Sequence, residues 1–239
     1  EDIGLSLHNI TLNEKTISYI IDYYTHEAGI RKLKEKLYEI LREVNILYLT
    51  GKINYPKNID TGFIDNIFKN KPKVIHKYIN DKPSIGIVNG LYATSSGTGG
   101  ITLIESLKMF SETSFSLELT GQQGDVMKES MKCSKTLAWN LIPGFIKSNI
   151  IQEWKQNKWG IHIHCPDTST PKDGPSAGAA ITLCLISLLT NIPVSNKIAL
   201  TGEIDLKGNI NKIGGLDSKI EGGKKAGVEL VLYPESNEK

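Results

Sequence analysis

The sequence predicts an α+β domain preceded by a small all-α bundle. Residues 1–69 place apolar side chains at helical intervals, whereas residues 84–239 mix short strand-like segments with helical ones. Between them, residues 70–83 are rich in Lys, Asn, Asp and Pro and carry few apolar residues, which is typical of a linker. We therefore predict a helical subdomain at 1–69, a linker at 70–83 and an α+β domain at 84–239.

Three helices are expected in the first segment. Thr11-Leu-Asn-Glu14 has the spacing of a capping box, which predicts a helix start there, and apolar residues follow at helical spacing as far as Tyr24. Residues 33–48 form a longer amphipathic pattern that Gly51 ends as a C-cap would. A short third helix is expected at 63–68.

The second segment is expected to mix strands and helices without internal repeats. Strands are predicted at 85–88, 101–105, 114–120, 160–165, 197–201 and 228–233. Helices are predicted at 125–140, 177–189 and 216–226, with a loop at 90–100 and a hairpin at 202–215. The residues expected on the buried side of the first of these helices are Val126, Met127, Met131 and Leu137.

Composition excludes several classes of protein. A net charge of +2 makes no electrostatic case for nucleic acid, so DNA is a possible partner but is not indicated. No run of 18 apolar residues occurs, so a membrane span is not expected. The three cysteines are widely spaced and are interpreted as thiols in a reducing compartment. The abrupt start and the end soon after an apolar strand lead us to expect a piece of a longer protein.

The polar loop Thr168-Ser-Thr-Pro-Lys-Asp-Gly-Pro-Ser-Ala-Gly178 leads into the longest apolar run of the chain. Its glycines and Pro175 favour unusual backbone geometry around Ser176. Ser176 stands where loop becomes helix, beside unpaired N–H groups, and such a place suits a nucleophile with its oxyanion. Serine is also a preferred helix N-cap. Both interpretations, nucleophile and cap, stay open on local sequence.

Histidine is the first base to consider for Ser176. Gly174-Pro-Ser-Ala-Gly178 fits the Gly-x-Ser-x-Gly elbow of α/β-hydrolases, but those enzymes place their histidine after the serine, and the last histidine here is His164. We therefore exclude that fold. His162 and His164 share one face of a predicted strand and could pair with Ser176 or bind metal. No Cys, Asp or Glu cluster completes a metal site, so no metal is predicted.

Lysine is the next candidate base, because a neutral amine can accept a serine proton once burial lowers its pKa. On the helix after Gly215, Lys219 lies on the apolar stripe that runs from Leu216 to Ala226. Pattern alone nominates Lys219, although a lysine on such a stripe could also extend to water.

No Gly-x-x-x-x-Gly-Lys-Ser/Thr occurs, so a phosphate loop is not expected. Arg31 is either a surface charge or a phosphate-sensing arginine.

Three motifs together resemble the proteolytic domain of the Lon family of ATP-dependent serine proteases. They are Pro171-Lys-Asp-Gly-Pro-Ser-Ala-Gly178, Leu200-Thr-Gly-Glu203 and Ile213-Gly-Gly-Leu-Asp-Ser-Lys219. They occur in the family's order, with 43 positions separating Ser176 from Lys219. Tyr24-Thr-His-Glu-Ala-Gly-Ile-Arg31 resembles the small helical subdomain of the family's AAA+ module. The resemblance covers nearly the whole chain except the linker.

The resemblance implies a Lon-type α+β domain with a ribosomal-protein-like βα fold and a Ser-Lys dyad. Ser176 corresponds to the nucleophile and Lys219 to the general base. Thr201 matches the threonine that helps hold the lysine, and Asp173 matches the acidic residue beside the nucleophile. Arg31 matches the sensor-2 arginine, which contacts nucleotide.

At the level of function, the resemblance implies an endopeptidase that degrades unfolded, damaged or short-lived proteins as a homo-hexamer. ATP with Mg would bind a core absent from this chain, and peptide hydrolysis itself would need no cofactor. The family's last helix and strand are absent too, so the domain is expected to be truncated at its carboxyl end. The alternative is a non-catalytic Lon-like assembly or binding module, against which the intact Ser176, Lys219 and Thr201 speak.

Two features refine the resemblance. The stretch Ser116-Leu-Glu-Leu-Thr-Gly-Gln122 resembles mitochondrial more than bacterial Lon, so we expect the mitochondrial matrix, with the bacterial cytoplasm as the alternative. Gly90-Leu-Tyr-Ala93 departs from the family pattern and has one extra residue before Gly99, which affects the expected shape of the substrate groove. Lys212 replaces a proline in a turn, a change that we expect to be tolerated.

Overall fold

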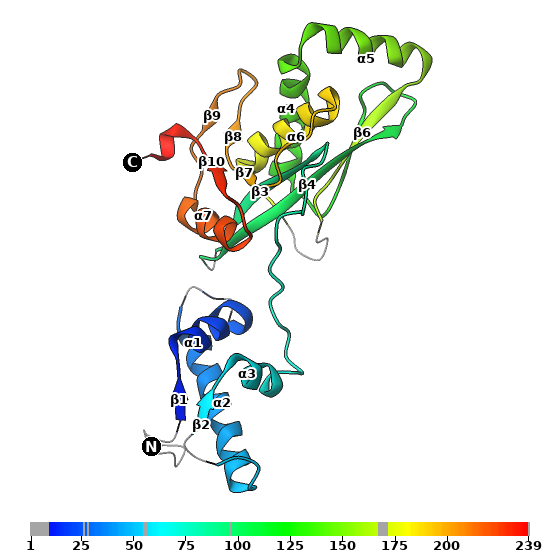
Figure 1. Ribbon diagram of the computed structural model, residues 1–239. Coiled ribbons are helices and arrows are strands. Elements are labelled where there is room, and N and C mark those ends of the chain that lie inside the picture. The colour runs from blue at the N-terminus through cyan, green and yellow to red at the C-terminus, as the bar shows by residue number, and fades with distance from the viewer. Residues whose placement is uncertain are drawn as a thin grey trace. The chain divides into compact units, whose positions relative to one another are not determined.

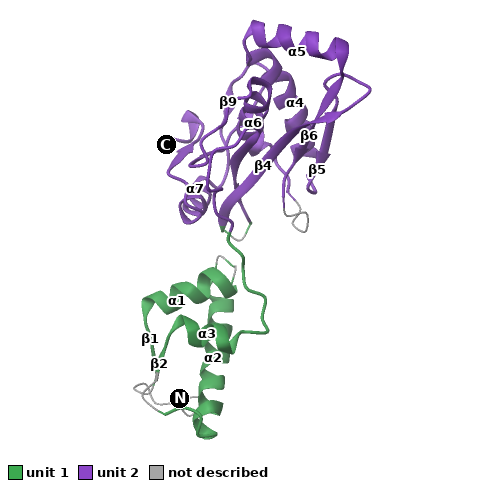
Figure 2. Cartoon of the chain, turned by 45° about the vertical axis from the view of Figure 1, so that its right-hand side comes forward, with its two compact units in different colours: residues 1–76, 95–98 green, residues 77–94, 99–239 purple. Residues whose placement is uncertain are grey.

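The computed structural model divides the chain into two compact units, and it describes residues 10–25, 27, 29–54, 57–95, 97–166 and 172–238. Unit 1 comprises residues 1–76 and 95–98, and unit 2 comprises residues 77–94 and 99–239 (Figure 2). The stretch 70–83, predicted as a linker, is divided between them. Val74 N–H donates to Tyr23 O at 2.9 Å within unit 1, whereas Ile79 N–H donates to Ala226 O at 3.0 Å within unit 2.

Unit 1 is helical, as predicted, with a small sheet in addition. Its helices are α1 (Glu14–Ile20), a π-helical turn η1 (Ile21–Thr25), α2 (Arg31–Leu49) and α3 (Thr61–Ile67) (Figure 1). Strands β1 (Ile10–Leu12) and β2 (Lys57–Ile59) pair in parallel. The helices pack because each buries one apolar face. The buried core consists of Ile20, Ile40, Val44, Ile59, Ile64 and Phe68.

The capping-box prediction at Thr11 is wrong by two residues. Thr11 lies in β1, and Asn13 is the N-cap of α1, with its Oδ1 accepting from Thr16 N–H at 2.8 Å. Asparagine is a better N-cap than threonine, but the capping-box spacing from Thr11 to Glu14 pointed to the weaker of the two residues. Strands of three residues, as in β1 and β2, are also too short to show a period of two.

Unit 2 has an α+β fold, as predicted. Its strands are β3 (Ile87–Ala93), β4 (Gly99–Phe110), β5 (Leu117–Thr120), β6 (Trp159–His164), β7 (Ile198–Leu200), β8 (Glu203–Ile204), β9 (Ile210–Asn211) and β10 (Leu230–Leu232). Its helices are α4 (Asp125–Leu141), α5 (Gly144–Gln156), a 3₁₀ turn η2 (Pro175–Ala177), α6 (Gly178–Thr190), α7 (Leu216–Lys225) and a 3₁₀ turn η3 (Glu235–Asn237).

The main sheet is mixed and has helices on both faces. Among the described residues its strand order is β10-β7-β3-β4-β6-β5, with β4 antiparallel to both of its neighbours. Helices α4 and α6 cover one face and α7 covers the other (Figure 1). Strands β8 and β9 form a separate hairpin. This arrangement brings the start of α6, the end of β7 and α7 to one end of the sheet.

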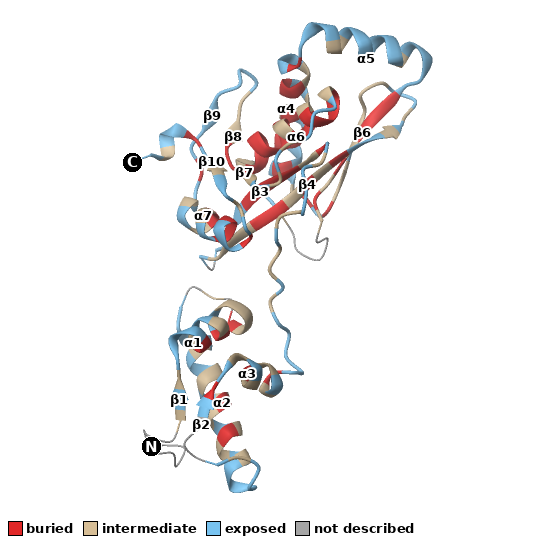
Figure 3. Cartoon of the chain, in the orientation of Figure 1, coloured by how far each residue is buried: buried red, intermediate tan, exposed pale blue. Residues whose placement is uncertain are grey.

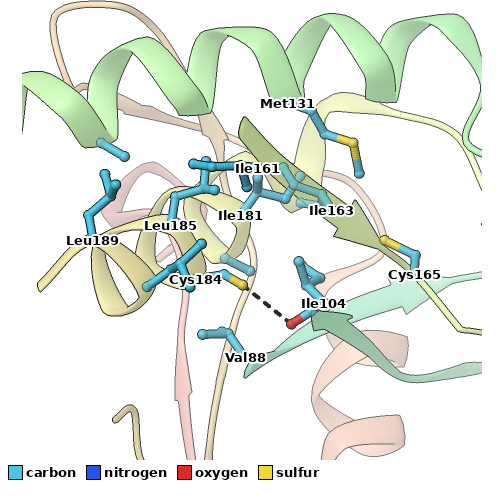
Figure 4. Close-up of a cluster of buried hydrophobic side chains, with 14 of the residues drawn as sticks. Val88, Ile104, Met131, Ile161, Ile163, Cys165, Ile181, Cys184, Leu185 and Leu189 are labelled. Carbon is cyan, nitrogen blue, oxygen red and sulfur yellow. Dashed lines mark hydrogen bonds between the residues drawn. The ribbon is translucent and has the colours of Figure 1, made fainter. Parts of the chain in front are cut away.

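The main core lies between the sheet and the α4–α6 layer. Figure 4 shows Ile161 and Ile163 of β6 facing Ile181 and Leu185 of α6. Helix α6 is buried along most of its length, while α5 is mostly exposed (Figure 3). Burying one such aliphatic side chain stabilises a fold by about 1.5–3 kcal/mol. The core therefore fixes the position of α6, the helix that directly follows Ser176.

Three sequence expectations for unit 2 need correction. Val126 is 46% exposed and not buried, although Met127, Met131 and Leu137 are buried as predicted. The predicted loop 90–100 is shorter, because its two ends belong to β3 and β4. Helix α5 was not predicted, and its buried residue in the described structure is Ile150 alone. A helix with so little buried surface leaves a weak apolar period.

The cysteine side chains are free thiols, as expected. Cys133, Cys165 and Cys184 are all free. Cys184 Sγ donates to Gly86 O at 3.1 Å, and burial raises the pKa of this thiol to about 12. A thiol with so high a pKa is unreactive at neutral pH, so Cys184 is a packing residue. Among the described residues, no helix is long and apolar enough to cross a membrane.

Candidate active site

Ser176 lies in the 3₁₀ turn η2, immediately before α6. Gly174 enables this turn, because its φ of 107° is a conformation that side chains disfavour. The N-cap of α6 is Ala177, and no side chain caps this helix. The interpretation of Ser176 as an N-cap is therefore wrong. Its hydroxyl is instead within hydrogen-bond distance of a lysine. The Thr168–Pro171 part of the loop lies outside the described residues.

Lys219 is the lysine that meets Ser176. It lies in the first turns of α7 and is only 3% exposed. Its Nζ donates to Ser176 Oγ and to Thr201 Oγ1, each at 3.0 Å. The alternative in which Lys219 extends to water is therefore wrong. Burial lowers the pKa of Lys219 below its ordinary value, because desolvation disfavours the charged amine.

Thr201 links the two residues. It follows β7, and its N–H donates to Leu232 O of β10 at 3.0 Å, which holds the end of β7 in place. Its hydroxyl donates to Ser176 O at 3.2 Å, so its lone pairs face Lys219. A hydroxyl that is already donating can act toward the lysine only as an acceptor. Thr201 therefore orients the Lys219 amine by accepting one of its N–H groups. The rest of the amine remains able to interact with Ser176 Oγ.

The serine loop is fastened along helix α4. Asp173 sits at the amino end of α4, where Met127 N–H donates to its Oδ1 at 3.0 Å. Backbone N–H groups of Gly174 and Met127 hold the pKa of the Asp173 carboxyl below its ordinary value. Gly124, the N-cap of α4, has no side chain, and a methyl group there would lie 2.3 Å from Asp173 Cγ. Asp173 thus takes the place of a capping side chain.

Two serines of α4 extend this attachment. Ser130 Oγ donates to Pro175 O at 3.4 Å, and Ser134 Oγ donates to Gly178 O at 3.2 Å. Sequence reasoning missed both serines, as well as Gly124. A serine inside a helix gives no signal of its own, because its hydroxyl usually bonds to the preceding turn. The partners become neighbours only in the folded chain.

An oxyanion site is available beside Ser176. Ala177 and Gly178 use their N–H groups within η2, but within the described part of the chain Ser176 N–H has no hydrogen-bond partner. It lies at the amino end of α6, where the helix dipole favours negative charge. A free N–H beside a nucleophile can stabilise the oxygen of a tetrahedral intermediate.

The two histidines are engaged elsewhere. Thr120 Oγ1 of β5 lies 2.7 Å from His162 Nε2 and 2.7 Å from His164 Nδ1, so its hydroxyl bridges the two histidine rings of β6. Neither histidine is hydrogen-bonded to Ser176. No group of three or more metal-ligating side chains occurs in the ranges that the structure describes. The constellation at Ser176 is thus built from hydroxyl and amine groups.

Arg31 begins α2 in unit 1. Its side chain is 83% exposed, and its Nε lies 3.8 Å from Glu35 Oε1. An exposed ion pair at this distance contributes little to stability, so the arginine is free to turn toward a ligand. His26 and Ala28, which belong to the motif around Arg31, lie outside the described residues. Its role as a nucleotide sensor stays a prediction.

Comparison with known proteins finds family matches in both units of the chain. Residues 59–239 match the family described as the Lon protease (S16) C-terminal proteolytic domain. Residues 1–57 match the Lon protease AAA+ ATPase lid domain. A Lon protease homolog of Acanthamoeba polyphaga mimivirus is 36% identical over 296 residues, covering 99% of this chain and 28% of that protein. The Lon protease of Clostridium beijerinckii is 38% identical over 237 residues, covering 99% of this chain and 28% of its own length.

Other relatives show the same coverage. The Lon protease of Mycoplasmopsis agalactiae is 37% identical over 236 residues, which cover 99% of this chain and 23% of that protein. The chain therefore spans about a quarter of the length of the curated relatives that it matches.

Proposed function

We propose that this chain, which belongs to the Lon protease family, supplies the peptide-cleaving part of an ATP-dependent serine endopeptidase. Ser176 is the nucleophile and Lys219 is the general base. The observation that carries the proposal is the joint geometry of a buried lysine 3.0 Å from a serine hydroxyl and 3.0 Å from Thr201. A serine nucleophile that has no histidine partner needs another general base, and a desolvated lysine can serve as that base.

The reaction begins with a proton transfer inside the dyad. Neutral Lys219 Nζ accepts the Ser176 hydroxyl proton through its lone pair, while one of its own N–H groups continues to donate to Thr201 Oγ1. Ser176 Oγ then forms a bond to the carbonyl carbon of the peptide, and the carbonyl oxygen takes up the electron pair. The N–H of Ser176, which has no hydrogen-bond partner among the described residues, would stabilise that oxygen.

Collapse of the tetrahedral intermediate breaks the C–N bond. Lys219, now protonated, gives its proton to the departing amine and returns to its neutral form, leaving an acyl ester on Ser176. Water attacks the ester with Lys219 again as base, and the carboxyl product leaves. Each proton that Lys219 accepts is thus returned, so the cycle needs no metal and no cofactor.

We propose further that the substrates are unfolded or damaged proteins and that the protease works as a homo-hexamer. The match of residues 1–57 to an ATPase lid, and the greater length of the relatives, support an ATP- and Mg-binding core outside this chain. Arg31, exposed at the start of α2, would contact the nucleotide from the lid. The mitochondrial matrix is the proposed location, supported by residues 116–122, with the bacterial cytoplasm as the alternative.

Single substitutions in the intact protease test the dyad. Ser176→Ala and Lys219→Ala should each abolish cleavage of an unfolded protein in the presence of ATP, while ATP hydrolysis persists. Wild-type proteolysis by either variant would show that the dyad is wrong. A peptide boronate should form an adduct on Ser176 of the wild type. No adduct in the assembled protease would favour the non-catalytic module instead.

A further inference from the structure

Helix α7 lies against the start of β4 with no side chains between the two backbones. A methyl group added at Gly222 would lie 2.1 Å from the carbonyl carbon of Gly99 and 2.2 Å from Gly100 N. From the other side, a methyl group added at Gly99 would lie 1.9 Å from Ser218 O. These separations are far below van der Waals contact. Only glycine at 99 and 222 allows the approach.

The contact surrounds the lysine. Ser218 and Gly222 stand before and after Lys219, about one helical turn apart, and both face Gly99. A methyl group at Gly99 would also lie 3.0 Å from Lys219 N. The backbone that carries Lys219 is thus in contact with Gly99 of β4 on both sides of the lysine. A shift of α7 away from the sheet would carry Nζ away from Ser176 and Thr201.

The close approach of α7 to β4 also keeps the Lys219 amine away from water. The charged residues of α7 itself are Asp217, Glu221, Lys224 and Lys225, and all four are exposed. Strand β3 contains no charged residue, and those of β4, Glu105 and Lys108, lie in its second half. Among the described residues no carboxylate forms a salt bridge with Lys219. The burial of Lys219 Nζ, which depends on how closely α7 approaches the sheet, therefore governs whether the amine is protonated.

We infer that the Gly99–Gly222 backbone contact is a positioning element for the general base, because it sets the depth at which α7 presents Lys219 to Ser176 and Thr201. Gly99 and Gly222 touch no substrate, and they act through Lys219. The inference rests on the proposed function of Lys219, and it adds two residues whose role is otherwise unassigned.

The neighbouring glycine supplies a matched control. A methyl group at Gly223 would meet Leu91 Cδ2 at 3.1 Å, and the next atom, Val228 Cβ, lies at 3.7 Å. The end of a leucine side chain can move by a few tenths of an ångström, whereas the backbone of Gly99 cannot. Substitution of Gly222 or of Gly223 by alanine gains the same helix propensity. The two variants therefore differ mainly in whether they push α7 away from β4.

The test compares Gly222→Ala with Gly223→Ala in the intact protease, using a fluorogenic peptide. Gly222→Ala should lower kcat by about 100-fold with little change in KM, since a misplacement of about 1 Å can cost that much. The pH at which activity is half-maximal should rise toward the pKa of a solvated lysine, about 10.4. Gly223→Ala should stay within about threefold of wild type at an unchanged midpoint.

Several outcomes would overturn the inference. Equal kinetics for the two variants would do so, as would a loss of kcat in Gly222→Ala without any change in the pH midpoint. Failure of both Gly222→Ala and Gly99→Ala to fold, with Gly223→Ala folded, would show that the contact serves the fold and not the lysine. Lys219→Ala, assayed alongside, separates these results from failure of the proposed function. If that variant keeps full activity, the dyad itself is wrong.

Discussion

The two halves of the candidate site are held in different ways. Ser176 is held by hydrogen bonds, since its loop is attached to α4 through Asp173, Ser130 and Ser134. Lys219 is held by packing, since α7 approaches β4 through bare backbone. Directional bonds orient a polar loop but admit water, whereas close packing excludes water and lowers the lysine pKa. The Ser176 nucleophile requires a fixed orientation, and the Lys219 base requires that water be excluded from its amine.

The largest expected effect comes from removing the amine. Lys219→Met should lower kcat/KM by about 1,000-fold or more, because general-base catalysis is lost. The same variant should be more stable than wild type by about 1 kcal/mol, since a buried amine without a carboxylate partner destabilises the fold. Peptide cleavage and thermal unfolding measure the two effects.

The sign of the pH dependence follows from the lowered pKa. Folded Lys219 resists protonation, so the wild type is penalised most below the pKa of Lys219 in the folded state. The penalty disappears as pH rises from that value toward the pKa in the unfolded chain, about 10.4. The stability gain of Lys219→Met should therefore shrink with rising pH. A gain that grows with pH would mean that burial does not lower this pKa.

Thr201→Val should break the link between the two halves. Valine keeps the shape but removes the acceptor for Lys219 Nζ and the donor to Ser176 O. We expect kcat/KM to fall by about 100-fold, as when a reacting group is misplaced by about 1 Å. Thr201→Ser, which keeps the hydroxyl, is the control. Similar losses in Thr201→Val and Thr201→Ser would show that the packing of this side chain matters and that its hydroxyl alone does not account for the effect.

A smaller effect is expected on the serine side. Asp173→Ala should lower the free energy of unfolding, because α4 loses the side chain that caps its amino end. It should lower kcat by about tenfold, because the loop loses its attachment to α4. Adding Gly124→Ser to this variant supplies a local cap in the space left by the carboxylate.

The double variant separates the two roles of Asp173. Stability should return in Asp173→Ala/Gly124→Ser, and kcat should not, because the introduced side chain caps α4 without holding the loop. Chemical denaturation and peptide cleavage report the two quantities. Recovery of kcat together with stability would show that Asp173 serves only the helix.

The smallest effect is expected at the histidines. Thr120 Oγ1 already bonds to both rings, and neither is hydrogen-bonded to Ser176. His162→Gln and His164→Gln should each keep kcat/KM within about twofold of wild type, because a base out of hydrogen-bond reach cannot take the proton. A large loss confined to kcat in either variant would bring histidine back as a candidate base.

Sequence reasoning found the two central residues for physical reasons that are local. Ser176 stands out because Gly174 and Pro175 force a special turn, and Lys219 stands out because it interrupts an apolar stripe on α7. Thr201 and Asp173 were identified only through family resemblance. The helix that Asp173 caps begins 48 residues earlier in the chain, so no local pattern points to the pair.

The order of elements in unit 2 was also predictable, but their exact contacts were not. Alternating residues predicted β6, and the long apolar run predicted α6. The close approach of Gly99 to Gly222 left no signal beyond two glycine pairs, because glycine is equally common in loops. Helix α5 was missed because its surface is mostly exposed.

The pH dependence of kcat/KM for a fluorogenic peptide tests the central claim most directly. With Lys219 as a buried base, activity in the intact protease should rise with pH through a single ionisation whose pKa lies below that of a solvated lysine, about 10.4. The ionisation should be absent in Lys219→Ala and unchanged in His162→Gln and His164→Gln. A midpoint near that of histidine, about 6.5, that disappears with His162 or His164 would contradict the account.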